Sequence, residues 1–513
     1  MGFLRGLRYR FAAEPAVQRA QPKHELYHEI FGSILDRSEM TPYLLLAAGG
    51  YRVALRQATR MMGNRGFDTV GAEDLRASEK ARAAAYLRQV RRYFCDWLLP
   101  FVSKQLGDLA ALRSASRATY EAAAGCIASL QTILEDRKLR RLVDEDPRHV
   151  FLLASSRKFP NLFAGYRGRK LVVPGHWQHV ACAMLKMGHL IKSIEEDSQD
   201  IHDYAQLGLF LEMQGHNLDD LFNFNWDHPD KLPGSEAAQR AFVKVSTFFH
   251  KLKESMTFDP ARACLVFNSG DGVEVDIVEV RARLKSPESM FTKLGKTLEG
   301  EAHDIRDILA VTFLLKNRDD TLTLFHALQK RGVILQENTV SHSITQSLFA
   351  SPEAMLEAVR RLTISLARSE GNTHHPSPKE LRARAREFFD ALSVNTGKNL
   401  DSSPRHRKFQ CKINFSVPIH RHAVSRRILI PGTPRYMARD TITTQTQQHT
   451  LGVELRISDE DGWQASEWKG ESHHDAYKFR QLLSLMNRLF RPLFHFPGDA
   501  LPQLRKDQER LFA

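Results

Sequence analysis

The sequence has few cysteines and no long apolar run. Its five cysteines, Cys95, Cys126, Cys182, Cys264 and Cys411, lie far apart among 513 residues and form no C-x-x-C pair. This spacing excludes a disulfide framework and a cysteine-based zinc site, and it fits a reducing cytoplasm. The best apolar run, residues 308–315, is much shorter than the roughly 20 residues that span a bilayer, so we expect no integral membrane association.

The sequence also lacks the glycine-rich loops that many nucleotide-binding proteins use to hold phosphate. It contains neither a G-x-x-x-x-G-K-[ST] loop nor a dinucleotide glycine motif, which excludes both of these devices. Positive charge, by contrast, is in excess: 73 Lys and Arg face 60 Asp and Glu, which leaves a net charge of +13. Such a surplus favours a polyanionic partner, although a solvated arginine-rich surface would have the same composition.

Two kinds of hydrophobic pattern divide the chain near residue 256. In the first part, apolar residues recur at steps of three and four, which is typical of helices with one buried face. These helices are expected at residues 72–106, 117–144, 176–194, 201–213 and 237–256. Alternating, β-branched stretches begin after residue 258, and a turn rich in glycine and asparagine at residues 268–272 predicts a β-hairpin.

The second part mixes strands with helices. Strands are predicted at residues 263–267, 273–280, 308–315, 333–335, 409–417 and 451–457. Helices are predicted at residues 287–298, 321–330, 378–392 and 476–490. We therefore predict an α+β protein with a helical N-terminal domain over residues 1–256, of regulatory or scaffolding role, and a mixed β-sheet domain flanked by helices over residues 257–513.

The most informative stretch leaves a predicted strand and enters a predicted helix. Arg283 and Lys285 are two residues apart on the strand and share one face, while Ser289 and Lys293 are four apart on the helix and share another. The helix N-terminus adds its own positive end. Cations, a hydroxyl group and free backbone N–H groups therefore converge, which predicts a polyphosphate site.

Two carboxylates could complete this site with a metal ion. Asp307 stands at the start of the buried strand predicted at 308–315, and Glu454 lies in the strand predicted at 451–457. A carboxylate that faces bound phosphate is a typical ligand of Mg²⁺. We therefore expect Asp307 to bind Mg²⁺, and Glu454 offers a second carboxylate.

At this point the sequence resembles the (p)ppGpp synthetase domain of the RelA/SpoT proteins, a branch of the nucleotidyltransferase fold. The family pattern R-x-K-S-x-x-S-x-x-x-K is matched by Arg283, Lys285, Ser286, Ser289 and Lys293. The metal-binding Asp of D-L-I-x-I-R is matched by Asp307, and three further family elements resemble residues 404–411, 454–459 and 474–478. With its helical first half, the chain is most similar to a bacterial group of RelA/SpoT-domain proteins.

The resemblance implies a reaction and a set of roles. The family transfers the β,γ-pyrophosphate of ATP to the ribose 3′-OH of GDP or GTP, and this implies a transferase of the stringent response. Arg283, Lys285 and Lys293 would neutralise the ATP phosphates, and Ser289 would orient them. Asp307 and Glu454 would bind Mg²⁺, and Glu454 is also a candidate acceptor of the 3′-OH proton. The acceptor nucleotide would contact Arg405, Phe409, Gln410 and His474, with Phe409 stacked on its base.

Departures from the family pattern leave other functions open. Thr312 and Ile413 stand where the family has Arg and His, and these changes lie around the phosphate and acceptor sites. The acceptor could therefore be the 3′ end of a tRNA, or the domain could be a degenerate nucleotide- or RNA-binding protein. His179 and the pair His202–Asp203 resemble part of an HD hydrolase site, but no suitable later Asp follows, so we do not predict a hydrolase.

Overall fold

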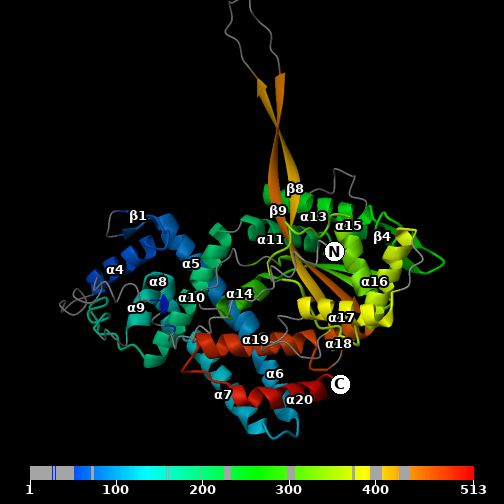
Figure 1. Ribbon diagram of the computed structural model, residues 1–513. Coiled ribbons are helices and arrows are strands. Elements are labelled where there is room, and N and C mark those ends of the chain that lie inside the picture. Colours follow the sequence, from blue (N-terminus) through cyan, green and yellow to red (C-terminus); the bar gives the residue numbers. More distant parts are fainter. Residues whose placement is uncertain are drawn as a thin grey trace, which may run out of the picture.

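The computed structural model describes most of the chain. The described residues are 26, 29–30, 51–70, 74–156, 159, 161–197, 199–223, 233–296, 305, 307–341, 343–371, 376–392, 407–426, 440–468 and 470–513. In this part of the chain no helix is long and apolar enough to cross a membrane. Helices form most of the first 253 residues, and a mixed sheet with its own helices follows (Figure 1).

The described helices of the first part lie close to the predicted ones. Their bounds are α4 Tyr51–Gly63, α5 Ala77–Arg92, η1 Tyr93–Leu98, α6 Leu99–Ala111, α7 Arg117–Leu134, α8 Arg137–Glu145, α9 His149–Ser155, α10 Gly175–Asp197, α11 Gln199–Met213, α12 Leu218–Asn223 and α13 Glu236–Lys253. The predicted helix 117–144 is broken because the Asp136 side chain caps α8, accepting from the backbone N–H of Lys138 at 2.7 Å. The expectation of helix alone is wrong in one place, where β1 (Thr69–Val70) and β2 (Asp74–Leu75) form a short antiparallel pair.

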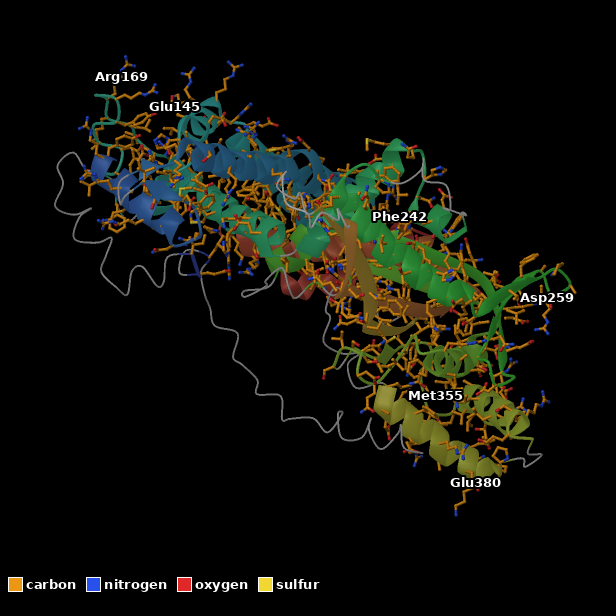
Figure 2. All side chains as sticks on the ribbon, turned by 90° about the horizontal axis from the view of Figure 1, so that it is seen from above. Glu145, Arg169, Phe242, Asp259, Met355 and Glu380 are labelled. Atoms are coloured by element: carbon orange, nitrogen blue, oxygen red, sulfur yellow. The ribbon has the colours of Figure 1, made fainter. Side chains whose placement is uncertain are left out.

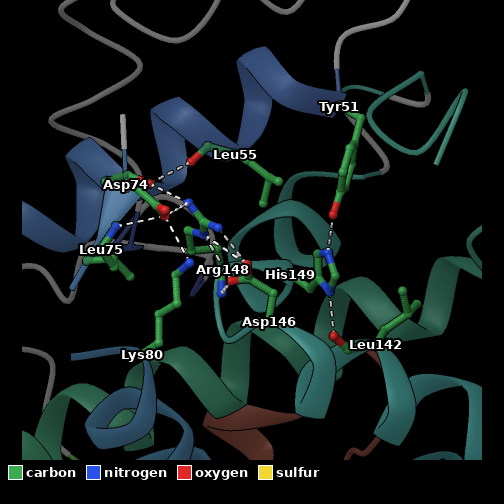
Figure 3. A network of polar contacts seen from close by, with 10 residues as sticks. Tyr51, Leu55, Asp74, Leu75, Lys80, Leu142, Asp146, Arg148 and His149 are labelled. Carbon is green, nitrogen blue, oxygen red and sulfur yellow. Dashed lines mark hydrogen bonds and ion pairs between the residues drawn. The ribbon is translucent and has the colours of Figure 1, made fainter. Parts of the chain in front are cut away.

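A buried polar network joins helices of the first part (Figure 3). The guanidinium of Arg148 donates to Asp146 and, at 3.1 Å, to Asp74 beside α5. The neighbouring His149 ring bonds to the Tyr51 hydroxyl at 2.7 Å and to the carbonyl oxygen of Leu142. Burial lowers the pKa of His149, so the ring is neutral at pH 7. These contacts fix α4, α8 and α9 relative to one another.

Seven strands form one sheet in the order β3-β4-β5-β6-β9-β8-β7. Their bounds are β3 Met256–Asp259, β4 Cys264–Asn268, β5 Glu274–Leu284, β6 Leu309–Leu315, β7 Thr345–Gln346, β8 Phe409–Arg426 and β9 Asp440–Asp459. Only the central pair β6 and β9 is parallel. The predicted hairpin of β4 and β5 is confirmed. The strand predicted at 333–335 is wrong. The N–H groups of Val333 and Ile334 both donate to the carbonyl oxygen of Leu328, at the end of helix α15 (Thr321–Lys330).

The last two long strands extend beyond the body of the molecule as an arm. Backbone pairing of β8 with β9 runs from Phe409 opposite Ile457 to Arg426 opposite Asp440, further than the sequence pattern predicts. Figure 1 shows this two-stranded arm rising above the helices. The remaining helices of the second part are α14 Pro287–Lys296, α16 Leu356–Ser369, α17 Pro378–Leu392, α18 Glu460–Glu467, α19 His474–Leu489 and α20 Leu501–Leu511.

Helices from the end of the chain pack against the first part. The Tyr120 hydroxyl of α7 donates to Asp507 of α20 at 2.7 Å, and the ammonium of Lys478 in α19 lies 4.4 Å from the ring centroid of Trp97. Helix α14 also approaches α10 and α19 closely, since a Cβ on Gly295 would lie 2.7 Å from Leu485. The two parts therefore share one continuous hydrophobic core. Figure 2 shows them side by side, with Glu145 and Arg169 at one end and Asp259 at the other.

Candidate functional site

One face of the central sheet spans four neighbouring strands, and three of them, β5, β9 and β8, carry charged side chains on it. The register aligns four residues across β5, β6, β9 and β8: Arg283, Ala310, Glu454 and Lys412. Side chains two residues apart on a strand point to the same face, so the next row of this face follows. It consists of Arg281, Thr312, Arg456 and Gln410. The sheet thereby gathers residues that are far apart in the sequence.

Asp307 lies at the edge of this face, just before β6, and is held by lysines from three elements. The ammonium of Lys285 is 2.7 Å from one carboxylate oxygen, and that of Lys293, on α14, is 2.6 Å from the other. Lys412 of β8 lies 3.4 Å away. Burial alone would raise the pKa of Asp307, but these lysines outweigh burial and hold it far below its usual value. Asp307 is therefore ionised at any physiological pH.

Glu454 is the second buried carboxylate of the site. Its side chain bonds to the guanidinium of Arg456 and lies 3.9 Å from the ammonium of Lys412, which connects it to Asp307. Burial acts to raise the pKa of Glu454, but the positive charges of Arg456 and Lys408 outweigh burial and lower this pKa to about 2. A carboxylate that is this acidic accepts a proton poorly. Glu454 therefore suits cation binding better than the proton transfer that the sequence also suggested.

Positive charge exceeds negative charge around these two carboxylates. Six cationic side chains lie in or beside the cluster: Arg283, Lys285, Lys293, Lys408, Lys412 and Arg456. Burial lowers the pKa of Lys285 to about 8, and burial together with Arg456 lowers that of Lys408 to about 7. A polyanion bound beside such crowded cations would favour their charged forms. The cluster is therefore suited to a polyphosphate.

A small cavity adjoins the cluster and shares Arg283, Lys408 and Arg456 with it. Its volume is about 100 Å³, and its walls include two aromatic side chains, Trp463 of α18 and Tyr477 of α19. Thr312, Arg407, Ser458, Glu467, His474 and Arg480 also line it. The cavity could take a planar or polar group next to a phosphate chain, because such sites combine apolar walls with a few placed polar groups.

Most of the residues predicted from the sequence come together here. Arg283 and His474 line the cavity, and Gln410 lies on the charged face opposite Arg456. Ser289 stands in the first turn of α14, where its hydroxyl is 3.1 Å from that of Ser286. Arg405 lies outside the described residues.

Phe409 is the predicted site residue that the structure places elsewhere. It is 1% exposed, and its ring centroid lies 5.0 Å from that of Phe325 in α15, on the apolar face of the sheet. Alternation along β8 explains this position, because Lys408 and Gln410 take the charged face and Phe409 must take the other. The predicted stacking of Phe409 on an acceptor base is therefore wrong. Trp463 and Tyr477 are the aromatic residues at the cavity instead.

Sequence reasoning missed three cations of the site, Lys408, Lys412 and Arg456. Arg456 was within reach, because it is two residues from Glu454 on one strand and must share its face. It also pairs across the sheet with Thr312, which stands where the RelA/SpoT pattern has an arginine. Lys408 and Lys412 each lie two residues from the predicted site residue Gln410, so the same alternation indicated their face, but their approach to the carboxylates depends on the pairing of β8 with β9.

The fit of the site to a metal ion depends on its two carboxylates. Among the described residues there is no group of three or more His, Cys, Asp or Glu side chains that could hold a metal ion. Asp307 and Glu454 nevertheless face the same lysine, and Mg²⁺ commonly uses one or two carboxylates with phosphate and water as its other ligands. The pair therefore fits Mg²⁺ together with a polyphosphate.

The pair His202–Asp203, which resembled part of an HD hydrolase site, lies elsewhere in the structure. Its Asp203 carboxylate forms an ion pair with the guanidinium of Arg240 at 2.8 Å.

Comparisons with known proteins do not identify the chain. No family model matches it, no curated protein matches it, and no solved structure matches it. What the site can do therefore follows from its own residues: cations for a polyphosphate, two ionised carboxylates for a divalent ion, and an adjoining cavity. Transfer of phosphoryl or pyrophosphoryl groups depends mainly on positioning and charge neutralisation, which this inventory can supply.

Proposed function

We propose that the protein is an ATP-dependent pyrophosphotransferase that makes (p)ppGpp or a related nucleotide. In this reaction the ribose 3′-oxygen of GDP or GTP attacks the β-phosphorus of ATP. The bond from that phosphorus to the α–β bridging oxygen breaks, AMP leaves, and the hydroxyl proton passes to solvent. The observation that carries the proposal is the buried pair Asp307 and Glu454 within a cluster of cations on one sheet face. The resemblance to RelA/SpoT synthetase domains supports the same reaction.

The donor would bind where the lysines meet Asp307. Lys285, Lys293 and Lys412 now neutralise one carboxylate, and bound triphosphate would give them stronger partners. Asp307 and Glu454 would hold Mg²⁺, which when bound supplies further neutralisation of the phosphate charge. Lys285 leaves β5 and Lys293 stands on α14, so two separate elements fix the phosphates from different sides.

The base of the acceptor nucleoside would lie against the adjoining cavity. Trp463 offers a stacking surface there, and Arg281 lies 5.3 Å from its ring centroid on the outer side. Arg407 and Lys408 line the same cavity, between the aromatic residues and the carboxylates. An acceptor held in this way would direct its ribose toward the phosphate cluster. The five free cysteines and nucleotide substrates favour a cytoplasmic location.

A direct assay tests the proposal. Purified protein is incubated with ATP labelled at its γ-phosphate, Mg²⁺ and either GDP or GTP, and we expect AMP together with a labelled 3′-pyrophosphorylated product. Asp307→Asn should abolish both products. Asp276→Asn is the matched control, because Asp276 pairs with Arg262 on the solvent side of β5 and should keep full activity. Failure to form AMP with any nucleotide acceptor, in folded protein that binds ATP, would overturn the proposal.

A polynucleotide acceptor is the second candidate. The long β8–β9 arm projects from the same two strands that carry Lys412 and Glu454, and it could guide an extended substrate toward them (Figure 1). The net charge of +13 is suited to RNA as well. Adding tRNA to the same assay separates the candidates, since label would then follow the RNA. Nucleotide binding without AMP formation from any acceptor would instead identify a degenerate nucleotide- or RNA-binding domain.

A further inference from the structure

A second cavity lies in the helical first part of the molecule. Its volume is about 330 Å³, and residues of α4, α5, α9 and α10 and of the segments next to them line it. Apolar and aromatic side chains form most of its walls: Met62, Phe67, Tyr86, Leu87 and Phe151. None of its lining residues belongs to the charged face of the sheet. A cavity of this size and lining is typical of a small-molecule site.

Arg65 brings a positive charge to this apolar cavity. Its guanidinium donates to the carbonyl oxygens of Met61 at 3.1 Å and Ile30 at 3.0 Å, and it lies 5.5 Å from the ring centroid of Phe151. Burial lowers the pKa of Arg65. No carboxylate pairs with it among the residues that the structure describes. A partly buried arginine is costly unless an anion compensates it.

Two lysines on α10 add to the charge on the wall of this cavity. Lys186 lies 2.8 Å from a carboxylate oxygen of Glu29, but the other oxygen of Glu29 accepts from Arg488, so two cations share one carboxylate. Lys192 pairs with Glu196, and its ammonium lies 5.2 Å from the ring centroid of Phe67. Among the described residues that line the cavity, Arg65, Lys186 and Lys192 are cationic and Glu29 is acidic. A cationic ligand would be repelled here.

We propose that this cavity binds an amphipathic anion, with its charged group beside Arg65 and Lys186 and its apolar body against Phe67 and Phe151. The anionic group would give Arg65 an ionic partner in addition to the carbonyl oxygens of Met61 and Ile30, and the aromatic walls would remove the ligand's apolar surface from water. A carboxylate, phosphate or sulfonate would serve, because all three accept from a guanidinium. This site is independent of the proposed transferase reaction.

The test uses two fluorescent probes with nearly the same aromatic body. 1-Anilinonaphthalene-8-sulfonate carries the charge, and N-phenyl-1-naphthylamine does not. We expect saturable binding of the charged probe to the full-length protein at one site, and binding of the neutral probe at least about tenfold weaker. Arg65→Met should weaken the charged probe by about tenfold and leave the neutral probe unchanged. Arg76→Met is the matched control, because Arg76 is exposed at the start of α5 and should have no effect.

Further variants separate this site from others. Lys186→Met should also weaken the charged probe, whereas ATP should not displace it and Asp307→Asn should not affect it. Thermal unfolding checks that each variant is folded. Equal affinity for the two probes, unchanged affinity in both Arg65→Met and Lys186→Met, or displacement of the probe by ATP would each overturn the proposal.

Discussion

Binding of a nucleoside triphosphate should be accompanied by uptake of protons by the protein, and the number of protons taken up should depend on pH. Burial lowers the pKa of Lys285 to about 8 and, with Arg456, lowers that of Lys408 to about 7. Before nucleotide binds, each lysine therefore loses its charge as the pH rises through these values. A bound polyphosphate favours the charged form and restores the proton. Affinity should consequently be highest at low pH and fall as the pH rises.

The size of this effect follows from the two pKa values. At pH 7.5, about three quarters of the Lys408 side chains and about one quarter of those of Lys285 have lost their proton. Binding that recharges both therefore takes up about one proton per nucleotide, and the dissociation constant rises about tenfold per pH unit near this pH. In Lys408→Met only the contribution of Lys285 remains, so the uptake should fall to about a quarter of a proton.

Isothermal titration calorimetry measures this directly. A non-hydrolysable ATP analogue is titrated with Mg²⁺ present, in two buffers of different ionisation enthalpy, and the difference in heat gives the protons taken up. Lys330→Met is the control, because Lys330 lies near Asp271 at the surface and its loss should leave the uptake unchanged. Proton release on binding, or an uptake that Lys408→Met leaves intact, would refute the reasoning.

Three further predictions concern single side chains. Trp463→Ala should raise the KM for the acceptor nucleotide at least about tenfold by loss of base stacking and leave the KM for ATP unchanged in steady-state kinetics. Phe409→Leu should lower the free energy of unfolding by about 1 kcal/mol without changing the acceptor KM, and a selective rise in that KM would return Phe409 to the site. Tyr120→Phe should lower the free energy of unfolding by about 1–2 kcal/mol, because Asp507 loses a hydroxyl donor; unchanged denaturant unfolding would contradict the role of α20 in joining the two parts.

Regular hydrophobic pattern and clear end signals made several elements predictable. All seven residues of β6 are buried, as its uninterrupted apolar run indicates, and α15 and α17 begin and end at the predicted residues. Helix α20 was not predicted, because its fully buried face includes Asp507 and Gln508 in place of an apolar stripe. Those two side chains are buried only because α7 and α19 supply partners, Tyr120 and Arg480, that no local pattern announces.

The candidate site was predictable where it is local and unpredictable where it depends on register. Lys285 and Lys293 flank one strand-to-helix connection, so their approach to the residue that opens the next strand follows from short-range geometry. The position of Lys412 depends on the pairing of β8 with β9, which no local pattern fixes. A shift of one residue in that pairing would exchange Lys412 for Ile413 on the charged face. The motif match made an error of this kind when it assigned Phe409 to the site, because the charged face carries its neighbours Lys408 and Gln410.

The ion pairs around Asp307 and Glu454 indicate how the parts of the proposed site would act together. Both carboxylate oxygens of Asp307 already accept from lysines, so a divalent cation alone would compete with two ammonium groups for them. A polyphosphate reverses this competition, because its oxygens attract the lysines and leave the carboxylate open. Glu454 is restrained in the same way by Arg456. On the proposed function, the charge arrangement would therefore favour binding of nucleotide and metal ion together over binding of either alone.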